Sequence, residues 1–510
     1  MKRAAVLVAA CLLCAPAYAA GNDEAISAAR TWRGAHGADI LAEFARLLAL
    51  PNYGRDAADI QKNADAVEAL LRKRAFTVRQ LKIEGAPPLV YAERRAPSAT
   101  RTIAIYIHYD GQPAKEKAWS EPPFQPTLMT RARIDGGTPR ALPKPGEAID
   151  PEWRLYARSS GDDKAPIIAL SAALDALDAA RIAPSSNIKL FLDGEEEIGS
   201  PHLGQYLAAH RELYSDVDLW LFCDGPVHQS GRAQLVFGAR GVTSVELTVY
   251  GANRDLHSGH YGNWAPVPGN LLAHLLAGMK AEDGRVLVKD FDKDVTPISP
   301  AERAAMKAVP DIDADIRKRF GLAETEKMNA PLIAEIRHNS LTFRGIESGF
   351  VGDAAKNAIP TTATASIEMR LAPGADPRRQ QERLEAHVRA QGYEVLDRDP
   401  TPEERLKYPR LAKIVRGQGY RGLMSPMDSP AATGLKAALA AAAPDLLLVP
   451  LLGGSLPLYE FADASKAPII ILPIANYDNN QHGPDENLRI GNLWYGIDVY
   501  AAVLTMERAP

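Results

Sequence analysis

The sequence has few cysteines, no excess of basic residues and no long apolar run beyond its first residues. Only three cysteines occur in 510 residues. Cys11 and Cys14 lie in the first twenty residues, so without that segment Cys223 stands alone and no internal disulfide can form. The 59 basic and 63 acidic residues argue against a non-specific nucleic-acid-binding protein. No later stretch reaches about 18 uninterrupted apolar residues, so no membrane span is expected after that segment.

The N-terminus has the three parts of a secretory signal. Lys2 and Arg3 form a basic start, residues 4–15 are apolar, and Ala17-Tyr18-Ala19 offers a small-x-small cleavage site. We therefore expect residues 1–19 to be removed and the protein to be periplasmic or secreted. Lipoprotein processing at Cys11 is the alternative.

The overall amino-acid composition is that of a globular protein. The residues AVILMFWYC make up 46% and DEKR 24%, and 38 glycines and 38 prolines follow no fixed period. The length predicts roughly two to four domains.

Short apolar runs alternate with helical patterns along both ends of the chain. This alternation predicts an α/β sheet with helices on both faces, whose ligands bind beyond the carboxyl ends of the strands. The expected strands cover residues 88–91, 102–107, 187–192, 218–222, 445–449 and 469–473. The expected helices cover residues 39–50, 58–74, 166–180 and 431–443.

The hydrophobic pattern changes after Arg240. Residues 242–250 show the alternation of side chains that is expected of a half-exposed strand. Helices at 270–279 and 377–390 and strands at 340–346 and 362–371 follow, with a last strand implied near Val395. This succession predicts a ferredoxin-like β-α-β-β-α-β domain, with residues 283–333 as an insertion or helical excursion. The predicted boundaries are 20–239 and 415–510 for one discontinuous domain and 240–414 for the inserted one.

Acidic and histidine side chains follow the buried strands. His108 and Asp110 lie on the same side of a strand end, so the carboxylate can orient the imidazole. Residues 193–197 hold four acids within five positions after another apolar strand, and like charges crowded there need a cation or raised pKa values. Asp224 ends a third strand.

Two further segments carry the same residue types. Asp162 and Asp163 precede a helix, and His482 follows the strand at 469–473. Together these strand-end residues suit two divalent metals of the zinc type that share a bridging carboxylate, with Asp110 and one glutamate left for proton transfer.

The motifs HYDGQP, SGDDKAP, DGEEEIGS, FCDG, DLHSGHYG and QHGPDE occur in that order. The set resembles the co-catalytic zinc peptidase family of carnosinase-type dipeptidases, aminoacylases, glutamate carboxypeptidases and succinyl-diaminopimelate desuccinylase, and it covers nearly all of the mature chain. The resemblance implies an α/β fold. Its catalytic domain, with a mostly parallel sheet, would be interrupted by an inserted α+β ferredoxin-like lid and dimerisation domain.

The resemblance also implies roles for individual residues. Asp162 would bridge two zinc ions, with manganese or cobalt as alternatives, Asp110 would orient His108, and Glu196 would be the general base. The implied metal ligands are His108, Asp162, Glu197, Asp224 and His482.

Further implied residues lie in the inserted domain and near the end of the chain. His257, in Asp255–Gly259, would stabilise the oxyanion in the partner subunit of a homodimer. Arg370 with Gly454 and Ser455 would bind the free carboxylate of the substrate, and Asn357 would be a polar contact from the lid.

Some positions depart from the family pattern. Ala157, Ser159 and Ala165 stand where the family usually has glycine, so the geometry of that loop is in question. The family often carries a cis peptide bond after the bridging aspartate.

We therefore expect an exported di-metal peptidase that cleaves dipeptides or short peptides with a free C-terminal carboxylate. The alternative is a deacylase of N-acyl amino acids, which offer the same carboxylate. A non-catalytic binding protein would have lost some of these ligands or Glu196, and all of them are present.

Overall fold

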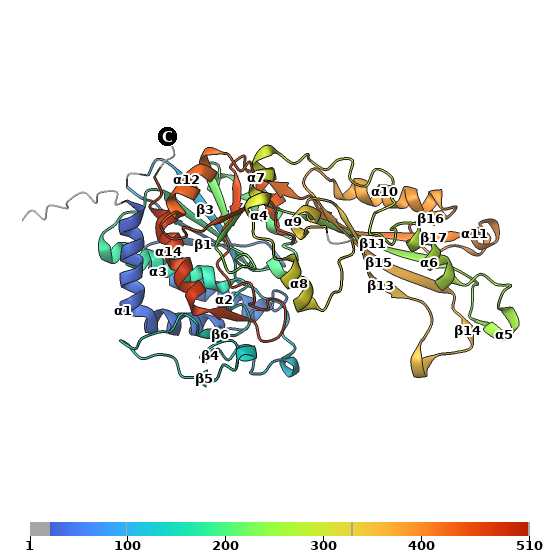
Figure 1. The fold of residues 1–510 in the computed structure, drawn as a ribbon, viewed down its shortest axis with the longest axis horizontal. Helices are drawn as coiled ribbons and strands as arrows, with labels where there is room; N and C mark the ends of the chain where they lie inside the picture. Colours follow the sequence, from blue (N-terminus) through green and yellow to red (C-terminus); the bar gives the residue numbers. More distant parts are fainter. Residues whose placement is uncertain (1–20, 98, 328–329, 508–510) are drawn as a thin grey trace, which may run out of the picture.

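The computed structural model describes residues 21–97, 99–327 and 330–507. The predicted signal segment and Cys11 lie outside this range. The chain forms two bodies side by side (Figure 1). We call them the main domain and the inserted domain, and the inserted domain extends from one side of the main domain. No helix of the described residues is long and apolar enough to cross a lipid bilayer.

The main domain is built on an eight-stranded sheet in the order β1-β2-β7-β3-β8-β20-β9-β19. The central strands β7, β3, β8 and β20 run parallel, whereas β1, β2 and the β20–β9 pair are antiparallel, so the sheet is mixed. Its strands are β1 (Thr77–Leu81), β2 (Leu89–Arg94), β3 (Thr102–His108), β7 (Asn187–Asp193), β8 (Leu219–Phe222), β9 (Gln234–Val236), β19 (Leu447–Val449) and β20 (Ile469–Ile471).

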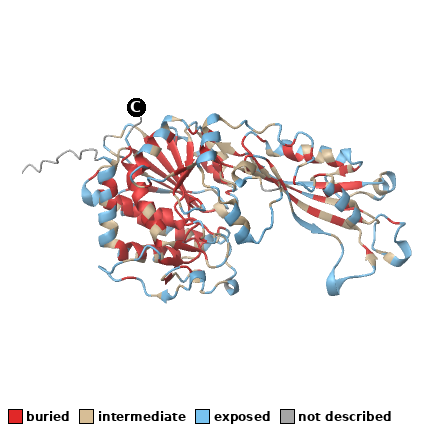
Figure 2. Cartoon of the chain, in the orientation of Figure 1, coloured by how far each residue is buried: buried red, intermediate tan, exposed pale blue. Residues whose placement is uncertain are grey.

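Helices cover both faces of this sheet, as the strand–helix alternation predicts. One face packs Ile103, Ile105 and Ile107 against the larger core, and the other packs Tyr106 and Trp220 in a second core. Buried residues fill this domain (Figure 2). The helices of the first face are α1 (Asn22–Leu48), α2 (Ala57–Arg72), α3 (Lys164–Ala180), α12 (Pro430–Leu439) and α14 (Ile490–Leu504), and those of the second are α4 (Leu203–Ala209) and α13 (Leu458–Ala464).

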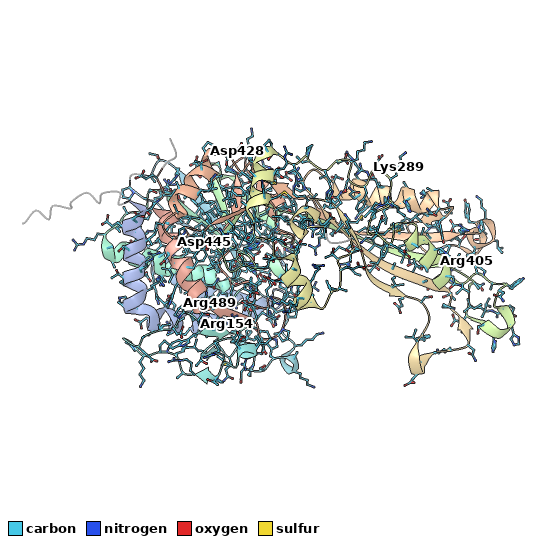
Figure 3. All side chains as sticks on the ribbon, viewed as in Figure 1. Arg154, Lys289, Arg405, Asp428, Asp445 and Arg489 are labelled. Carbon is cyan, nitrogen blue, oxygen red and sulfur yellow. The ribbon has the colours of Figure 1, made fainter. Side chains whose placement is uncertain are left out.

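A small antiparallel sheet in the order β21-β6-β4-β5 joins two distant parts of the main domain. Its register pairs Arg489 with Arg154, which Figure 3 labels next to each other. The loops that leave β6 and enter β21 are thereby held together. The strands are β4 (Thr127–Met129), β5 (Pro139–Arg140), β6 (Arg154–Tyr156) and β21 (Asn487–Arg489).

The inserted domain has a five-stranded sheet in the order β13-β15-β11-β17-β16. Residues alternate between buried and half-exposed along β15, and helices α6 and α10 cover the buried face. The strands are β11 (Gly241–Tyr250), β13 (Ser340–Glu347), β15 (Thr362–Leu371), β16 (Glu394–Leu396) and β17 (Leu411–Tyr420), and the helices are α6 (Pro268–Ala277) and α10 (Pro377–Ala390).

One strand of this domain corrects the expected boundary. The strand implied near Val395 is only the short edge strand β16, and the long partner of β11 is β17. Because β17 continues to Tyr420, the boundary predicted at residue 414 falls inside a strand. The domain therefore ends after Tyr420, where the antiparallel pair of β10 (Gly238–Ala239) and β18 (Leu423–Met424) returns the chain to the main domain.

Shorter elements connect these parts. The excursion expected at 283–333 contains α7 (Pro300–Ala308), α8 (Asp313–Phe320) and the start of α9 (Leu332–Glu335); α8 and α9 lie between the two domains (Figure 1). The remaining helices are α5 (Ser258–Tyr261), α7 (Pro300–Ala308), α8 (Asp313–Phe320), α9 (Leu332–Glu335) and α11 (Pro402–Lys407). The short 3-10 helices are η1 (Glu116–Ala118), η2 (Arg133–Asp135), η3 (Glu196–Ile198), η4 (Arg211–Leu213) and η5 (Gly352–Ala354). The two-residue strands are β10 (Gly238–Ala239), β12 (Leu256–His257), β14 (Ala358–Ile359) and β18 (Leu423–Met424).

Candidate metal centre

The parallel register of the main sheet brings three strand ends together. His108 ends β3 and pairs in register with Asp193 of β7, just before η3. Tyr106 of β3 pairs with Phe222 of β8, so Asp224 lies two residues beyond the end of that strand. Carboxyl ends of parallel strands meet at one edge, which is where these polar side chains gather.

The β6–β21 pair brings in the other two predicted ligands. The loop after β6 carries Asp162, and the loop before β21 carries His482. Asp162 contacts both predicted histidines: its Oδ1 lies 2.9 Å from Nε2 of His108 and its Oδ2 lies 3.1 Å from Nε2 of His482. The carboxylate of Asp162 thus contacts both histidines, as a ligand shared by two metal ions would.

Two groups of side chains have the spacing of a metal-binding site. In each group the potential ligand atoms lie within 4.8 Å of one another. The groups are His108, Asp163 and Asp224, and Asp162, Glu197 and His482. All five predicted ligands are therefore close together. Asp163 is not among the predicted ligands, and the structure adds it to the first group.

The charges of this site favour a cation. Burial and the charge of Asp162 raise the pKa of Asp224 to about 7, against the effect of His108. Hydrogen bonds to Asp162 and Glu197 raise the pKa of His482 to about 10. In addition, Oδ1 of Asp163 is buried without a hydrogen-bond partner. Carboxylate and imidazole donors with excess negative charge fit divalent metals of the zinc type.

Asp110 lies behind the predicted ligands. Its Oδ1 is 3.2 Å from Nδ1 of His108, and its two oxygens accept from the backbone N–H groups of Glu196 and Glu197, each at 3.1 Å. Burial raises the pKa of Asp110 to about 6, although its bond to His108 opposes the shift. One buried carboxylate therefore orients both the imidazole and the loop of the two glutamates.

Glu196 lies at the start of η3, next to Glu197. Burial raises the pKa of Glu196 well above its usual value, and the neighbouring carboxylates of Asp224, Glu197 and Asp110 add to this, against His108. Glu197 instead holds its Oε2 3.2 Å from Nε2 of His482. The two adjacent acids thus differ in surroundings: Glu197 lies among the potential ligands, and Glu196 is a carboxylate with a high proton affinity beside them.

Glu486 organises the loop that carries Asp162, and the sequence alone does not identify this role. Its carboxylate accepts from the backbone N–H groups of Ser159, Gly161 and Asp162 at 2.9–3.0 Å and pairs with Arg158 at 2.7 Å. Its only sequence signal is its place in QHGPDE.

The structure also defines the backbone of the loop in which the family usually has glycine at three positions. Ser159 adopts a left-handed φ of 63°, and the Asp162–Asp163 peptide bond is cis. Ala157 and Ala165 are not among the residues with positive φ. Of the three positions where the family usually has glycine, only the serine therefore adopts a conformation that favours glycine.

The predicted carboxylate-binding residues meet where the two domains join. Nη1 of Arg370, near the end of β15, donates to Oγ of Ser455 at 2.9 Å, while Nε of Arg370 donates to Glu368. Arg240, which is not among the predicted site residues, donates from its backbone N–H to the carbonyl of Gly454 at 3.2 Å. The loop of Gly454 and Ser455 is thereby attached to the start of the inserted domain.

His257 and Asn357 lie elsewhere, at the far end of the inserted domain. They belong to the region of β12, β14 and α5, distant from the main domain (Figure 1). The N–H of Ser258 donates to the carbonyl of Asn357, and the exposed imidazole of His257 caps α5 by accepting from Gly259. These two residues are close to each other, but they do not join the metal centre of their own chain.

Residues 104–506 match the peptidase family M20/M25/M40. A Cys-Gly metallodipeptidase of Schizosaccharomyces pombe is 25% identical over 421 residues, which cover 81% of each chain. The Beta-Ala-His dipeptidase of Mus musculus is 24% identical over 426 residues, 82% of this chain and 79% of that protein.

Solved structures agree in fold. An M20 family metallo-carboxypeptidase from Sulfolobus solfataricus matches with a TM-score of 0.75 and 24% identity over 92% of this chain and 98% of that one. Human carnosine dipeptidase 1 matches with a TM-score of 0.70 and 19% identity over 95% and 99%. Since the family match spans most of the sequence, including every predicted metal ligand, the chain belongs to peptidase family M20/M25/M40 and is a metal-dependent hydrolase.

Proposed function

We propose that this protein is an exported dipeptidase that hydrolyses dipeptides with a free C-terminal carboxylate. It would use two divalent metal ions, and zinc is the metal that we expect. The observation that carries this proposal is the contact of Asp162 with both His108 and His482, next to Glu196. The relatives described above, named as dipeptidases, support the choice of substrate. The secretory pattern of residues 1–19 supports export.

The ions would be held by one histidine and one further carboxylate each, with Asp162 between them. When bound, they would polarise the scissile carbonyl and increase the acidity of a water molecule. Asp163 belongs to the first group and would add its negative charge to that of Asp224.

The chain itself supplies the proton transfer. Glu196 would take a proton from the attacking water and pass it to the amine of the leaving amino acid, because its high proton affinity suits a general base that later acts as an acid. Asp110 would keep His108 and the glutamate loop in place during both transfers.

Arg370 and Ser455 would bind the terminal carboxylate of the substrate. Arg370 is partly exposed, so a substrate can reach its guanidinium, and a charge-assisted hydrogen bond there selects for a free carboxylate. Asn357 and His257 would act in the partner subunit of a homodimer formed through the inserted domain, with His257 stabilising the oxyanion. Their distance from the metal centre of their own chain agrees with this role.

A substrate panel tests the proposal. The chelated protein is reloaded with zinc, manganese or cobalt and assayed with dipeptides and with N-acyl amino acids that end in the same residue. We expect dipeptides to be cleaved faster. Faster cleavage of the N-acyl amino acids would instead favour the deacylase, since both substrates offer the carboxylate that Arg370 would bind.

A further inference from the structure

A row of side chains crosses the inserted sheet at its end nearest the main domain. The register places Ser340, Arg370, Val242 and Tyr420 side by side on β13, β15, β11 and β17. These residues are all half-buried, whereas Leu371 and Leu341, their neighbours along the strands, point into the core. The row therefore lies on the face of the sheet that carries Arg370.

The ring of Tyr420 is held against the main domain. It stacks on Tyr459 of α13 with ring centroids 4.7 Å apart and an angle of 14° between the planes. The next residue, Arg421, forms an ion pair with Asp463 of the same helix. Two contacts thus position the end of β17 on α13, and the position of the Tyr420 ring does not depend on a substrate.

Tyr420 lies close to the carboxylate-binding pair, because its register partner Val242 follows Gly241, whose carbonyl accepts from Ser455. A hydrogen bond with Ser455 and the charges of Glu196 and Arg370 act on the pKa of the Tyr420 phenol. Ser455 in turn accepts from Arg370 at 2.9 Å and donates to the carbonyl of Gly241 at 3.3 Å. In a dipeptide, the scissile bond and the terminal carboxylate are separated by one residue, and successive Cα atoms are about 3.8 Å apart.

We propose that Tyr420 is a substrate-binding residue whose hydroxyl donates a hydrogen bond to the terminal carboxylate held by Arg370 and Ser455. It thereby favours substrates with a free terminal carboxylate over those in which that carboxylate is blocked. This inference rests on the dipeptidase function proposed above. It adds a third group to the carboxylate site, one that belongs to the inserted domain but is anchored on the main domain.

The protonation of Tyr420 suits a donor. Burial and the charge of Glu196 raise its pKa to about 12, although Arg370 and Ser455 act in the opposite direction. The phenol thus keeps its proton at neutral pH and can donate to a carboxylate. Such a bond to a charged group is stronger than one to a neutral amide.

The test compares Tyr420→Phe with Tyr459→Phe, which removes the hydroxyl from the other ring of the stack. Both are assayed with one dipeptide and with its C-terminal amide, and thermal midpoints check that both variants fold. We expect Tyr420→Phe to lower kcat/KM for the dipeptide by about tenfold or more, mainly through KM. The amide should lose only about two- to threefold, and Tyr459→Phe should change neither value by more than about twofold.

Two results would overturn the assignment. If Tyr420→Phe slows the dipeptide and the amide by the same factor, the hydroxyl has a structural role only, and if it slows neither, it does not contact the substrate. Failure of the proposed function looks different, because the unmodified metal-loaded protein would then cleave no dipeptide at all, and the role of Tyr420 would be rejected with it.

Discussion

The most informative stability experiment concerns Glu486, the buried carboxylate that holds the Asp162 loop. Its ion pair with Arg158 is almost completely buried: 2% of the Arg158 side chain and 0% of the Glu486 side chain are exposed. Removal of one partner from such a pair leaves an uncompensated charge and costs about 3–5 kcal/mol. Glutamine keeps one oxygen for the backbone N–H groups, so we expect Glu486→Gln to cost about 3 kcal/mol. That is a large part of the roughly 5–15 kcal/mol that stabilises a typical domain.

Thermal unfolding and urea titration of the apoprotein measure this cost. Glu152→Gln is a matched control, because Glu152 also pairs with an arginine, Arg489, but is exposed. Exposed pairs contribute about 0–1 kcal/mol, so this variant should unfold close to the unmodified protein. Adding Arg158→Gln to Glu486→Gln should recover part of the loss, since the stranded charge is then gone. The reasoning is refuted if Glu486→Gln and Glu152→Gln unfold alike.

Four further outcomes are expected. Glu196→Gln should bind metal as the unmodified protein does, as measured by metal analysis after dialysis, but lose about 10²- to 10⁴-fold in kcat; an active variant would remove Glu196 as the base. Asp110→Asn should weaken metal binding by about 10- to 100-fold in a chelator competition, because His108 loses its orienting partner; unchanged affinity would contradict this role. For the homodimer proposed above, His257→Ala should fold and keep the sedimentation behaviour of the unmodified protein but turn over slowly, and wild-type rates would exclude a role in the partner's site. Chelation should abolish activity and zinc should restore it; activity that survives complete metal removal would contradict the metal-dependent mechanism.

Much of the site could be predicted because its residues follow buried strands. The run of apolar residues before His108, Asp193 and Asp224 marks three parallel strands, and parallel strands bring their carboxyl ends to one edge. The side chains that meet there were therefore visible as a group. Asp163 was visible as well, but only the folded loop places it in the first group with His108 and Asp224.

Other features have no local signal. The sequence near Val395 reads as a strand, yet β11 pairs with β17, which lies further along the chain and contains two residues of low strand propensity, Gly417 and Gly419, at a shift of the register. Pairing with β11 outweighs that low propensity.

The sequence by itself determined the two-part α/β organisation and the residue types of the metal centre, since apolar periodicity and charge are properties of short segments. Only the tertiary structure decided how distant segments combine. It brought Glu486 to the Asp162 loop through the β6–β21 pair, Arg370 to Ser455, and Tyr420 to Tyr459. These contacts join residues that are far apart in the chain, and their geometry depends on strand register and domain packing, which no local pattern encodes.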